Sequence, residues 1–495
     1  MRIRSPLATV LLAACSGHAD TSTVDPIGPT PIEVMPASTK VMRVTNLIAQ
    51  APQRDAQNRE APWSLTASDG NGLALTRVDG KAVVEGPLAF TELHLYFHNP
   101  EDRRREGTFS ITLPQGAVVS RFAMENEGQL QEAEVVEKQL ARRAYEDFLH
   151  RRQDPALLEK AEGNQFSARV FPILPKADKH VVISFSQQVT PGHYALPLRG
   201  LAKVDQVDIR VDMRGKDGGM VEQTIAERNW LPDRDVVVDG STVGAPDSVV
   251  AGELVAARVK LELPQAAEPP TGVTILVDTS ASRALGFDAL IKSVRQLVGD
   301  LGRDYGALPI QIVAFDQTTQ SIFDGRADKP GDIESAFAAR GALGASDLGQ
   351  ALAWLGDNKP LSRVLIVTDG VVTAGASGDD LAKLAKGIKG VERIDVALAG
   401  GIRDEQTAGA VAHAGLAHAG AVLDLDKGTT EVAHRMGLAV KTDVPIAIDG
   451  ARWVFPHAIA AAQSGDEITV FARRDVQHKL TVAIAGMRVP LSPVA

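Results

Sequence analysis

An acid and two hydroxyls stand at alternate positions directly after an apolar run in the middle of the chain. The run, residues 273–277, predicts a buried strand, because parallel strands covered on both faces are continuously apolar. Asp278, Ser280 and Ser282 follow in the loop at its carboxyl end, where ligands bind in open α/β sheets. These side chains offer only oxygen atoms, which suit a hard divalent cation such as Mg²⁺. The pattern therefore predicts a metal site at this strand end.

Two later stretches of the sequence supply further side-chain oxygen atoms that could contribute to the same metal site. Ser346 stands just before a helical pattern, and Asp369 ends a second buried strand at residues 364–367. The carboxyl ends of parallel strands meet at one edge of a sheet, so we expect Asp369 to lie near Asp278.

In this order the five donors resemble the metal-ion-dependent adhesion site of a von Willebrand factor A domain. That family holds its ion with a D-x-S-x-S motif, a Thr from a second loop and an Asp from a third. The resemblance implies five ligands, with serine where the family usually has Thr: Asp278, Ser280, Ser282, Ser346 and Asp369. It implies Mg²⁺ as the ion, with Ca²⁺ and Mn²⁺ as alternatives. An A-type fold whose site has decayed is the other interpretation.

The elements around these residues fit such a fold. From residue 271 to residue 440, short apolar runs alternate with amphipathic patterns, for example the helix expected at residues 285–301. Strands alternating with helices predict a doubly wound parallel sheet. No zinc-protease, nucleophile-elbow or P-loop motif occurs, so we expect a protein that is not an enzyme.

The sequence pattern of residues 63–190 is one of short strands, which predicts a β-rich domain. Residues 109–113 alternate between apolar and polar, as in a half-buried antiparallel strand. One helix is expected from Glu132 to about Leu149, where Val136, Leu140 and Phe148 recur at roughly helical spacing.

Several stretches of this domain follow one another in a specific order and spacing. They are VEG at 84–86, FHNP at 97–100, EK at 137–138, DPALLE at 154–159, RVFPI at 169–173 and ISFSQ at 183–187. Together they resemble the vault protein inter-alpha-trypsin (VIT) domain. The resemblance implies a β-rich domain that accompanies an A-type domain and carries no catalytic role.

The remaining segments predict further β structure. Residues 191–270 contain short strand patterns and a proline-rich linker, and residues 441–495 return to short strands after the A-type region. The whole chain is thus expected to be multidomain, with a VIT domain and a β extension, then an α/β A-type domain, then a C-terminal β segment. Its length of 495 residues agrees with about three domains.

The N-terminus predicts export. Two arginines precede a short apolar run that ends in LAAC, and Cys15 is the only cysteine of the chain. The run is too short to span a bilayer and fits a secretory signal. Residues 12–15 resemble the lipobox of bacterial lipoproteins, which implies a signal peptide at residues 1–15 and lipidation of Cys15. Ser16 after the cysteine favours the outer membrane by the same resemblance, and residues 16–62 have the composition of a flexible tether.

Charge and organisation together predict a binding protein of the bacterial cell envelope. The net charge of −10 argues against nucleic acid or an anionic membrane as partner, so membrane contact is expected through the lipid alone. The domain order is similar to that of inter-alpha-trypsin inhibitor heavy chains. By the A-type resemblance, the partner is a protein that offers an acidic side chain to the bound Mg²⁺. The alternative is a structural scaffold of an envelope complex without a metal-mediated grip.

One expectation concerns the metal-free protein. Replacing Asp278 by alanine should abolish cation-dependent binding without lowering metal-free stability, because neighbouring acids repel each other when the ion is missing.

Overall fold

The computed structural model describes residues 41–43 and 61–493, apart from 115, 127, 133, 138–156, 161–162, 191, 216–218, 240–243, 265 and 475–478. The predicted signal peptide with Cys15, and most of the predicted tether, lie outside the described residues. Within the tether, residues 41–43 form a short strand that pairs with a later one.

The N-terminal part consists of two sheets that share one apolar core. The larger sheet has the order β1-β14-β13-β3-β4-β11-β6-β7. Its strands are β1 (Val41–Arg43), β3 (Ala74–Glu85), β4 (Leu88–His98), β6 (Val118–Asn126), β7 (Gln129–Glu132), β11 (Asp178–Gln188), β13 (Val204–Arg214) and β14 (Met220–Trp230). The smaller sheet has the order β2-β5-β10-β9-β8, with β2 (Trp63–Ala67), β5 (Arg105–Thr112), β8 (Glu134–Glu137), β9 (Leu157–Lys160) and β10 (Gln165–Ile173). A separate pair is formed by β12 (His193–Leu196) and β15 (Val236–Asp239).

Period-two burial confirms the predicted strand character of this part. Along β4 and β5 buried and more exposed residues alternate, so each strand gives one face to the core. The helix expected from Glu132 is wrong over its first described residues, because residues 134–137 form β8, which pairs in parallel with β9. Two adjacent β-branched valines, Val135 and Val136, favour the strand there; residues 138–149 lie outside the described residues.

The strands in residues 191–270 belong to three sheets: β12 and β15 form the separate pair, and the others divide between two larger sheets. β13 lies parallel to β3 and β14 lies antiparallel to β13, so both extend the first large sheet. In contrast, β16 (Ser248–Ala251) and β17 (Leu254–Lys260) belong with the C-terminal strands, since β17 pairs antiparallel with β27 (Glu467–Arg474).

The α/β part is a six-stranded sheet with helices on both faces, as the alternating pattern predicts. The sheet order is β20-β19-β18-β21-β22-β23, and only β20 is antiparallel to its neighbour. The strands are β18 (Val273–Asp278), β19 (Pro309–Phe315), β20 (Thr319–Arg326), β21 (Arg363–Thr368), β22 (Arg393–Leu398) and β23 (Val422–Asp424). The helices are α3 (Phe287–Tyr305), α4 (Ile333–Arg340), α5 (Leu348–Asp357), α6 (Asp379–Lys386), α7 (Glu405–Ala412) and α8 (Thr429–Met436), with short 3₁₀ turns η1 (Ala281–Arg283) and η2 (Leu425–Lys427).

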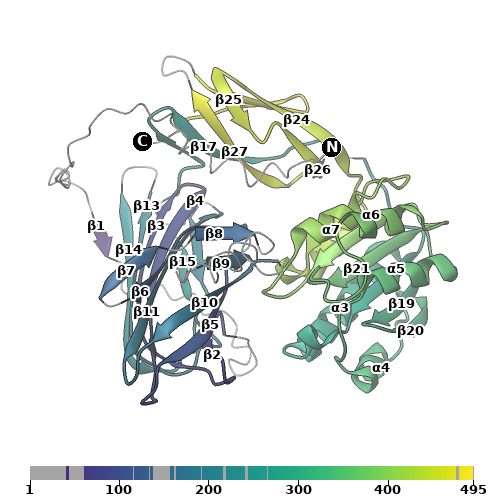
Figure 1. Cartoon of the computed structure of the whole chain (residues 1–495). Coiled ribbons are helices and arrows are strands. Elements are labelled where there is room, and N and C mark those ends of the chain that lie inside the picture. The colour runs from purple at the N-terminus through teal and green to yellow at the C-terminus, as the bar shows by residue number, and fades with distance from the viewer. Residues whose placement is uncertain are drawn as a thin grey trace. The chain divides into compact units, whose positions relative to one another are not determined.

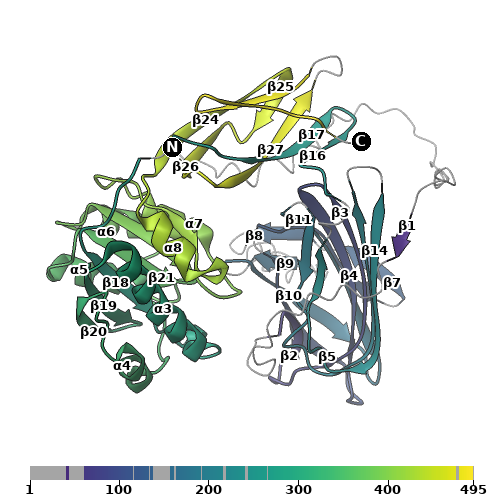
Figure 2. The same ribbon diagram turned by 180° about the vertical axis from the view of Figure 1, so that it is seen from behind.

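Two apolar layers flank this sheet. Buried residues of α3, α4 and α8 pack on one face, and buried residues of α5, α6 and α7 pack on the other (Figure 1). From behind, α3 and α8 are seen side by side on their face (Figure 2). Because both faces are covered, β18, β21 and β22 are buried along their whole length.

The α/β part is an insertion between strands of another β domain. That domain has two four-stranded sheets around one core, in the orders β16-β17-β27-β25 and β26-β24-β28-β29. Its remaining strands are β24 (Lys441–Asp449), β25 (Ala451–Phe455), β26 (Ala458–Ala462), β28 (Thr481–Ile484) and β29 (Met487–Pro490). The chain enters and leaves the α/β part side by side, since Ala267 forms an antiparallel bridge with Leu438.

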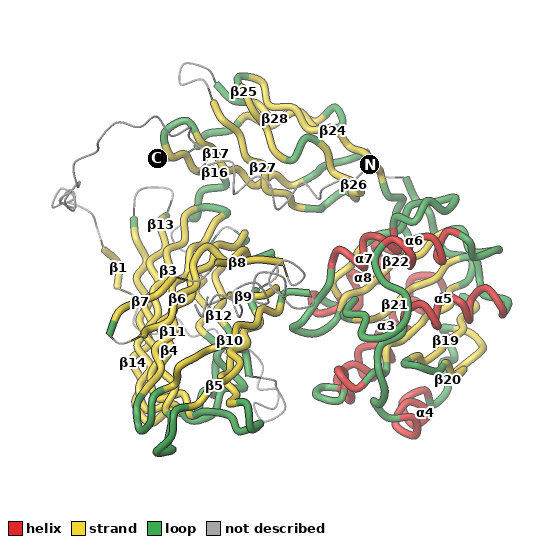
Figure 3. Tube along the Cα trace, in the orientation of Figure 1, coloured by secondary structure: helices red, strands yellow, loops and turns green. Residues whose placement is uncertain are grey.

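Helices within the described residues occur only between Ala281 and Met436 (Figure 3). None of these described helices is both long and apolar enough to cross a membrane.

Candidate metal centre

The two predicted carboxylates meet at the carboxyl edge of the six-stranded sheet. Asp278 is the last residue of β18, and Asp369 directly follows β21. These strands are parallel neighbours with Val277 opposite Val367, so both acids leave the sheet at the same edge. This is the edge at which open α/β sheets bind ligands.

Asp278 is completely buried and accepts hydrogen bonds at both carboxylate oxygens. Its Oδ2 accepts from Ser346 Oγ at 2.9 Å and from Thr368 Oγ1 at 2.8 Å. Its Oδ1 accepts from the Ser280 amide at 2.9 Å. The predicted contact between Asp278 and the second-loop serine is therefore present.

The other predicted donors form a connected chain of oxygens. Ser280 Oγ and Ser282 Oγ lie 3.0 Å apart, and Ser282 Oγ lies 3.4 Å from Asp369 Oδ2. Asp369 Oδ1 accepts from the Val371 amide at 2.9 Å. All five residues predicted from the sequence are thus brought together: Asp278, Ser280, Ser282, Ser346 and Asp369.

Local backbone contacts hold the second and third loops in place. The Ser346 amide donates to Thr373 Oγ1 at 2.9 Å, while the Thr373 amide donates back to the Ser346 carbonyl at 3.0 Å. Gly370 has a φ of +79°, and a Cβ there would lie 2.5 Å from the Asp404 carbonyl oxygen. Only glycine allows this turn and this close approach, so Gly370 fixes the path of the loop that carries Asp369.

Electrostatics at Asp369 indicate a lack of positive charge. The pKa of Asp369 is raised to about 6, mainly by burial; the Arg283 guanidinium lowers it, and the charge of Asp278 raises it. One neighbouring cation does not offset the cost of burying this carboxylate. A second cation would favour the ionised form of Asp369.

The donor set fits a hard cation. It consists of two carboxylates and three hydroxyls, with no nitrogen or sulfur ligand among the five residues. Among the described residues, no group of three or more His, Cys, Asp or Glu is placed to hold a metal ion. A metal at this centre would therefore depend on hydroxyl ligands as well as carboxylates.

Two residues at the centre were missed by the sequence analysis. Thr368 immediately precedes Asp369, and its hydroxyl contacts Asp278; a hydroxyl at a strand end is a signal that could have identified it. Arg283 follows Ser282 and forms an ion pair with Asp369. Nothing in the sequence pattern around Arg283 indicates that contact.

The surroundings of the centre are open and partly apolar. Ser282 is exposed, and the side chains of Leu285 and Leu343 are 56% and 67% exposed. Hydrogen bonds join their two loops, since the Leu343 amide donates to the Thr279 carbonyl at 3.0 Å and the Ala281 amide donates to the Gly344 carbonyl at 2.9 Å.

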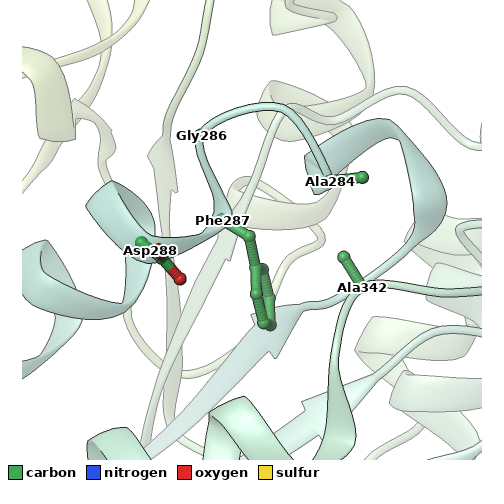
Figure 4. Close-up of a pocket in the computed structure, with 5 residues that line it drawn as sticks. All are labelled: Ala284, Gly286, Phe287, Asp288 and Ala342. Atoms are coloured by element: carbon green, nitrogen blue, oxygen red, sulfur yellow. The ribbon is translucent and has the colours of Figure 1, made fainter. Parts of the chain in front are cut away.

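A shallow pocket of about 290 Å³ lies between these loops. Its lining residues are Ala284, Gly286, Phe287, Asp288 and Ala342. Figure 4 shows the ring of Phe287, the first residue of α3, and the side chain of Ala342 on the other loop among the groups that line the pocket. The rim of the candidate centre thus offers apolar as well as polar contacts.

One comparison with known proteins bears on the first β-rich part of the chain. The sequence model of the vault protein inter-alpha-trypsin domain matches residues 75–185. A comparison with curated proteins found no significant match.

Solved structures similar to the chain include several A-type domains. One is a von Willebrand factor type A protein from Catenulispora acidiphila, with 15% identity, a TM-score of 0.28, and coverage of 50% of this chain and 68% of that one. Another is the manganese-loaded TRAP protein of Plasmodium vivax, with 12% identity, a TM-score of 0.25, and coverage of 43% and 96%. A third is an aerotolerance-related membrane protein from Bacteroides fragilis, with 14% identity, a TM-score of 0.27, and coverage of 34% and 96%. At such low TM-scores the likenesses carry no argument here.

Strand order, helix positions and the sequence match together define the class of protein. It is a multidomain protein in which β-rich domains accompany a doubly wound α/β domain. Within the first β-rich domain, residues 75–185 match the VIT family.

Proposed function

We propose that this protein binds a protein partner through a divalent cation held at the A-type domain, and that it does so from a lipid anchor in the bacterial envelope. The observation that carries the proposal is the convergence of five oxygen donors from three separate loops at one sheet edge. Asp278 and Asp369 supply the negative charge, while Ser280, Ser282 and Ser346 supply neutral oxygens. Mg²⁺ is the ion that we propose, with Ca²⁺ or Mn²⁺ as alternatives.

Binding by such a site needs an open side, and the exposed Ser282 provides one. A hard cation held by few protein oxygens retains positions for water, and a carboxylate from a partner can take one of them. The chain's own residues hold the loops around that position: Thr368 and Ser346 orient Asp278, and Gly370 shapes the third loop.

The two exposed leucines favour a protein partner over a small anion. Leu285 and Leu343 stand on the loops that border the pocket at the rim. Burying both would add about 1.5–3 kcal/mol each to an interface, whereas a free carboxylate anion would leave them in water. We therefore propose a partner that presents an acidic side chain next to apolar ones.

The proposal includes neither catalysis nor nucleic-acid binding. The hydroxyls and carboxylates of the centre are proposed as ligands of the cation, and the net charge of −10 argues against nucleic acid as a partner. Attachment to the membrane is proposed through a lipid on Cys15 alone.

Capture from envelope extract tests the proposal. The purified protein is immobilised and incubated with extract in Mg²⁺ or in chelator, beside Asp278→Asn and the double variant Leu285→Ser, Leu343→Ser. Leu231→Ser is a matched control, because Leu231 is 62% exposed on a loop of the first β domain.

We expect the wild type and Leu231→Ser to retain the same partner in Mg²⁺ and to release it in chelator. Asp278→Asn should capture none, and the double leucine variant should capture several-fold less. If the partner is still captured in chelator and by Asp278→Asn, the proposal is contradicted. That result would favour a scaffold role in which no metal ion mediates binding.

A further inference from the structure

The side chain of Arg283, the residue directly after Ser282, reaches into the candidate metal centre. Its Nη2 forms an ion pair with Asp369 Oδ2, the same oxygen that faces Ser282. Its Nη1 donates to the Ala399 carbonyl at 2.9 Å. The Arg283 side chain is only 10% exposed, so its guanidinium is packed within the centre and is not a surface group.

The loop after β22 leaves room for this guanidinium. Gly400 has a φ of +92°, and a Cβ there would lie 2.8 Å from Arg283 Nη1. The Ala399 amide donates to the Thr368 carbonyl at 3.0 Å, which fixes this loop against the end of β21. The place taken by the Arg283 guanidinium is therefore built by the fold.

The guanidinium is nevertheless incompletely satisfied there. Its Nε is buried and has no hydrogen-bond partner among the described residues. A buried unpaired donor is unfavourable, so moving Arg283 out into water would recover part of the cost of breaking its ion pair. This makes Arg283 a group that another cation can displace.

We propose that Arg283 is a built-in counter-ion of the metal centre, which neutralises Asp369 when no metal is bound and competes with the divalent cation for it. The inference rests on the proposed function, since it concerns the same cation. Two positive groups cannot share the buried Asp369 oxygen without repulsion. Binding of the divalent cation therefore requires Arg283 to move, and Arg283 sets the cation concentration at which the site fills.

Variants of Arg283 separate its charge from its packing. Arg283→Gln and Arg283→Met remove the charge but keep a long side chain, whereas Arg283→Lys keeps the charge. Arg303→Gln is the control: it removes one positive charge from the far end of α3, about 24 Å along the helix from its first turn.

Calorimetric titration of the full chain with Mg²⁺, together with thermal melts with and without Mg²⁺, tests the inference. We expect Arg283→Gln and Arg283→Met to bind Mg²⁺ about tenfold more tightly than the wild type, the size of effect that outer-shell residues have on metal affinity. Both should melt at lower temperature without metal and show a larger gain on adding it. Arg283→Lys and Arg303→Gln should bind much as the wild type does.

Other outcomes distinguish this inference from the proposed function. If the wild type, Arg283→Gln and Arg283→Met bind Mg²⁺ equally well, the counter-ion inference is wrong while the metal site stands. If the two uncharged variants bind more weakly, Arg283 supports the site and the inference is also wrong. If no chain binds Mg²⁺, both proposals are contradicted. If only Arg283→Gln and Arg283→Met bind Mg²⁺, the counter-ion inference is supported, but the proposal that the wild type functions through a bound cation is contradicted. Thermal melts of Arg283→Gln and Arg283→Met show whether either variant has lost its fold. The Mg²⁺ affinity of the wild type is then compared with that of the variant that remains folded.

Discussion

Asp278 accepts three hydrogen bonds within the protein itself, from Ser280, Ser346 and Thr368. Charge repulsion alone led us to expect that Asp278→Ala would leave metal-free stability intact, but these contacts change that expectation. Alanine would leave two hydroxyls and one amide without their buried acceptor, at about 1–3 kcal/mol for each group left unsatisfied. We now expect Asp278→Ala to melt at lower temperature without metal, and Asp278→Asn, which keeps one carbonyl oxygen, to melt closer to the wild type. Equal melts of Asp278→Ala and wild type in chelator would show that these hydrogen bonds contribute nothing.

Asp369 should make metal-free stability depend on pH. Its pKa rises from an ordinary 3.8 to about 6 in the folded protein, so the folded state binds this proton more tightly than the unfolded state. The resulting stabilisation is fully present below pH 3.8 and is lost as pH rises through 6, by up to about 3 kcal/mol. Denaturant unfolding in chelator between pH 4 and pH 7 measures this slope. Asp369→Asn should lack it, and an unchanged slope in that variant would assign the titration to another group.

At the residue scale, the sequence predicts the carboxylates of the candidate centre better than it predicts the groups that contact them. Asp278 and Asp369 could be predicted because each ends an apolar run and parallel strands end at one edge. Arg283 could not, because its contacts with Asp369 and Ala399 depend on the folded paths of two distant loops.

At the scale of the elements, the opposite ends of β21 and β22 hold a buried ionic cluster. Arg363 and Arg393 begin these strands, and both contact Asp395, at 3.2 Å and 2.8 Å. Both arginines also contact Glu268 in the incoming linker. Asp395 is completely buried, so its carboxylate is the main counter-charge for two buried guanidinium groups.

Asp395→Asn should therefore destabilise the protein by about 3–5 kcal/mol, since removal of one partner leaves the others buried and uncompensated. Mg²⁺ affinity of the folded fraction should not change, because the cluster lies at the other ends of the strands from the metal centre. Denaturant unfolding and Mg²⁺ titration together check both statements, with the exposed Asp380→Asn as control. Loss of Mg²⁺ affinity without loss of stability would contradict this separation.

Element prediction succeeded where burial made the pattern regular. The fully buried strands β18, β21 and β22 and the amphipathic α3 agree with their sequence patterns. The edge strand β20 was missed because its two large apolar residues, Ile322 and Phe323, are adjacent in the sequence and give no period-two pattern. Helix α4 was missed because it buries only Ile333 and Phe337.

At the scale of the whole molecule, one β domain is formed by two segments that are far apart in the sequence. The strands β16 and β17 share a core with β24 to β29, although the α/β part separates them in sequence. Sequence periodicity can indicate a strand, but it carries no information on which strands pair across a long insertion. The pattern thus predicted strands in residues 191–270 but not the three sheets among which they divide.

The anchoring proposal also belongs to the whole molecule. If Cys15 is lipidated, Cys15→Ser should move the protein from the membrane fraction to the soluble fraction and abolish labelling by a fatty-acid analogue. Fractionation and labelling measure this. Labelling that persists in Cys15→Ser, or a soluble wild type, would contradict the anchor.

The most direct test of the central claim is a calorimetric titration of the wild-type chain with Mg²⁺ beside Asp278→Asn and Asp369→Asn. Each substitution removes one of the two carboxylates, and neutral hydroxyls cannot replace that charge. We predict one Mg²⁺ site in the wild type and loss of most of the affinity in each variant. Equal binding by the wild type and both variants, or no binding by the wild type, would contradict the assignment of these residues to a metal centre.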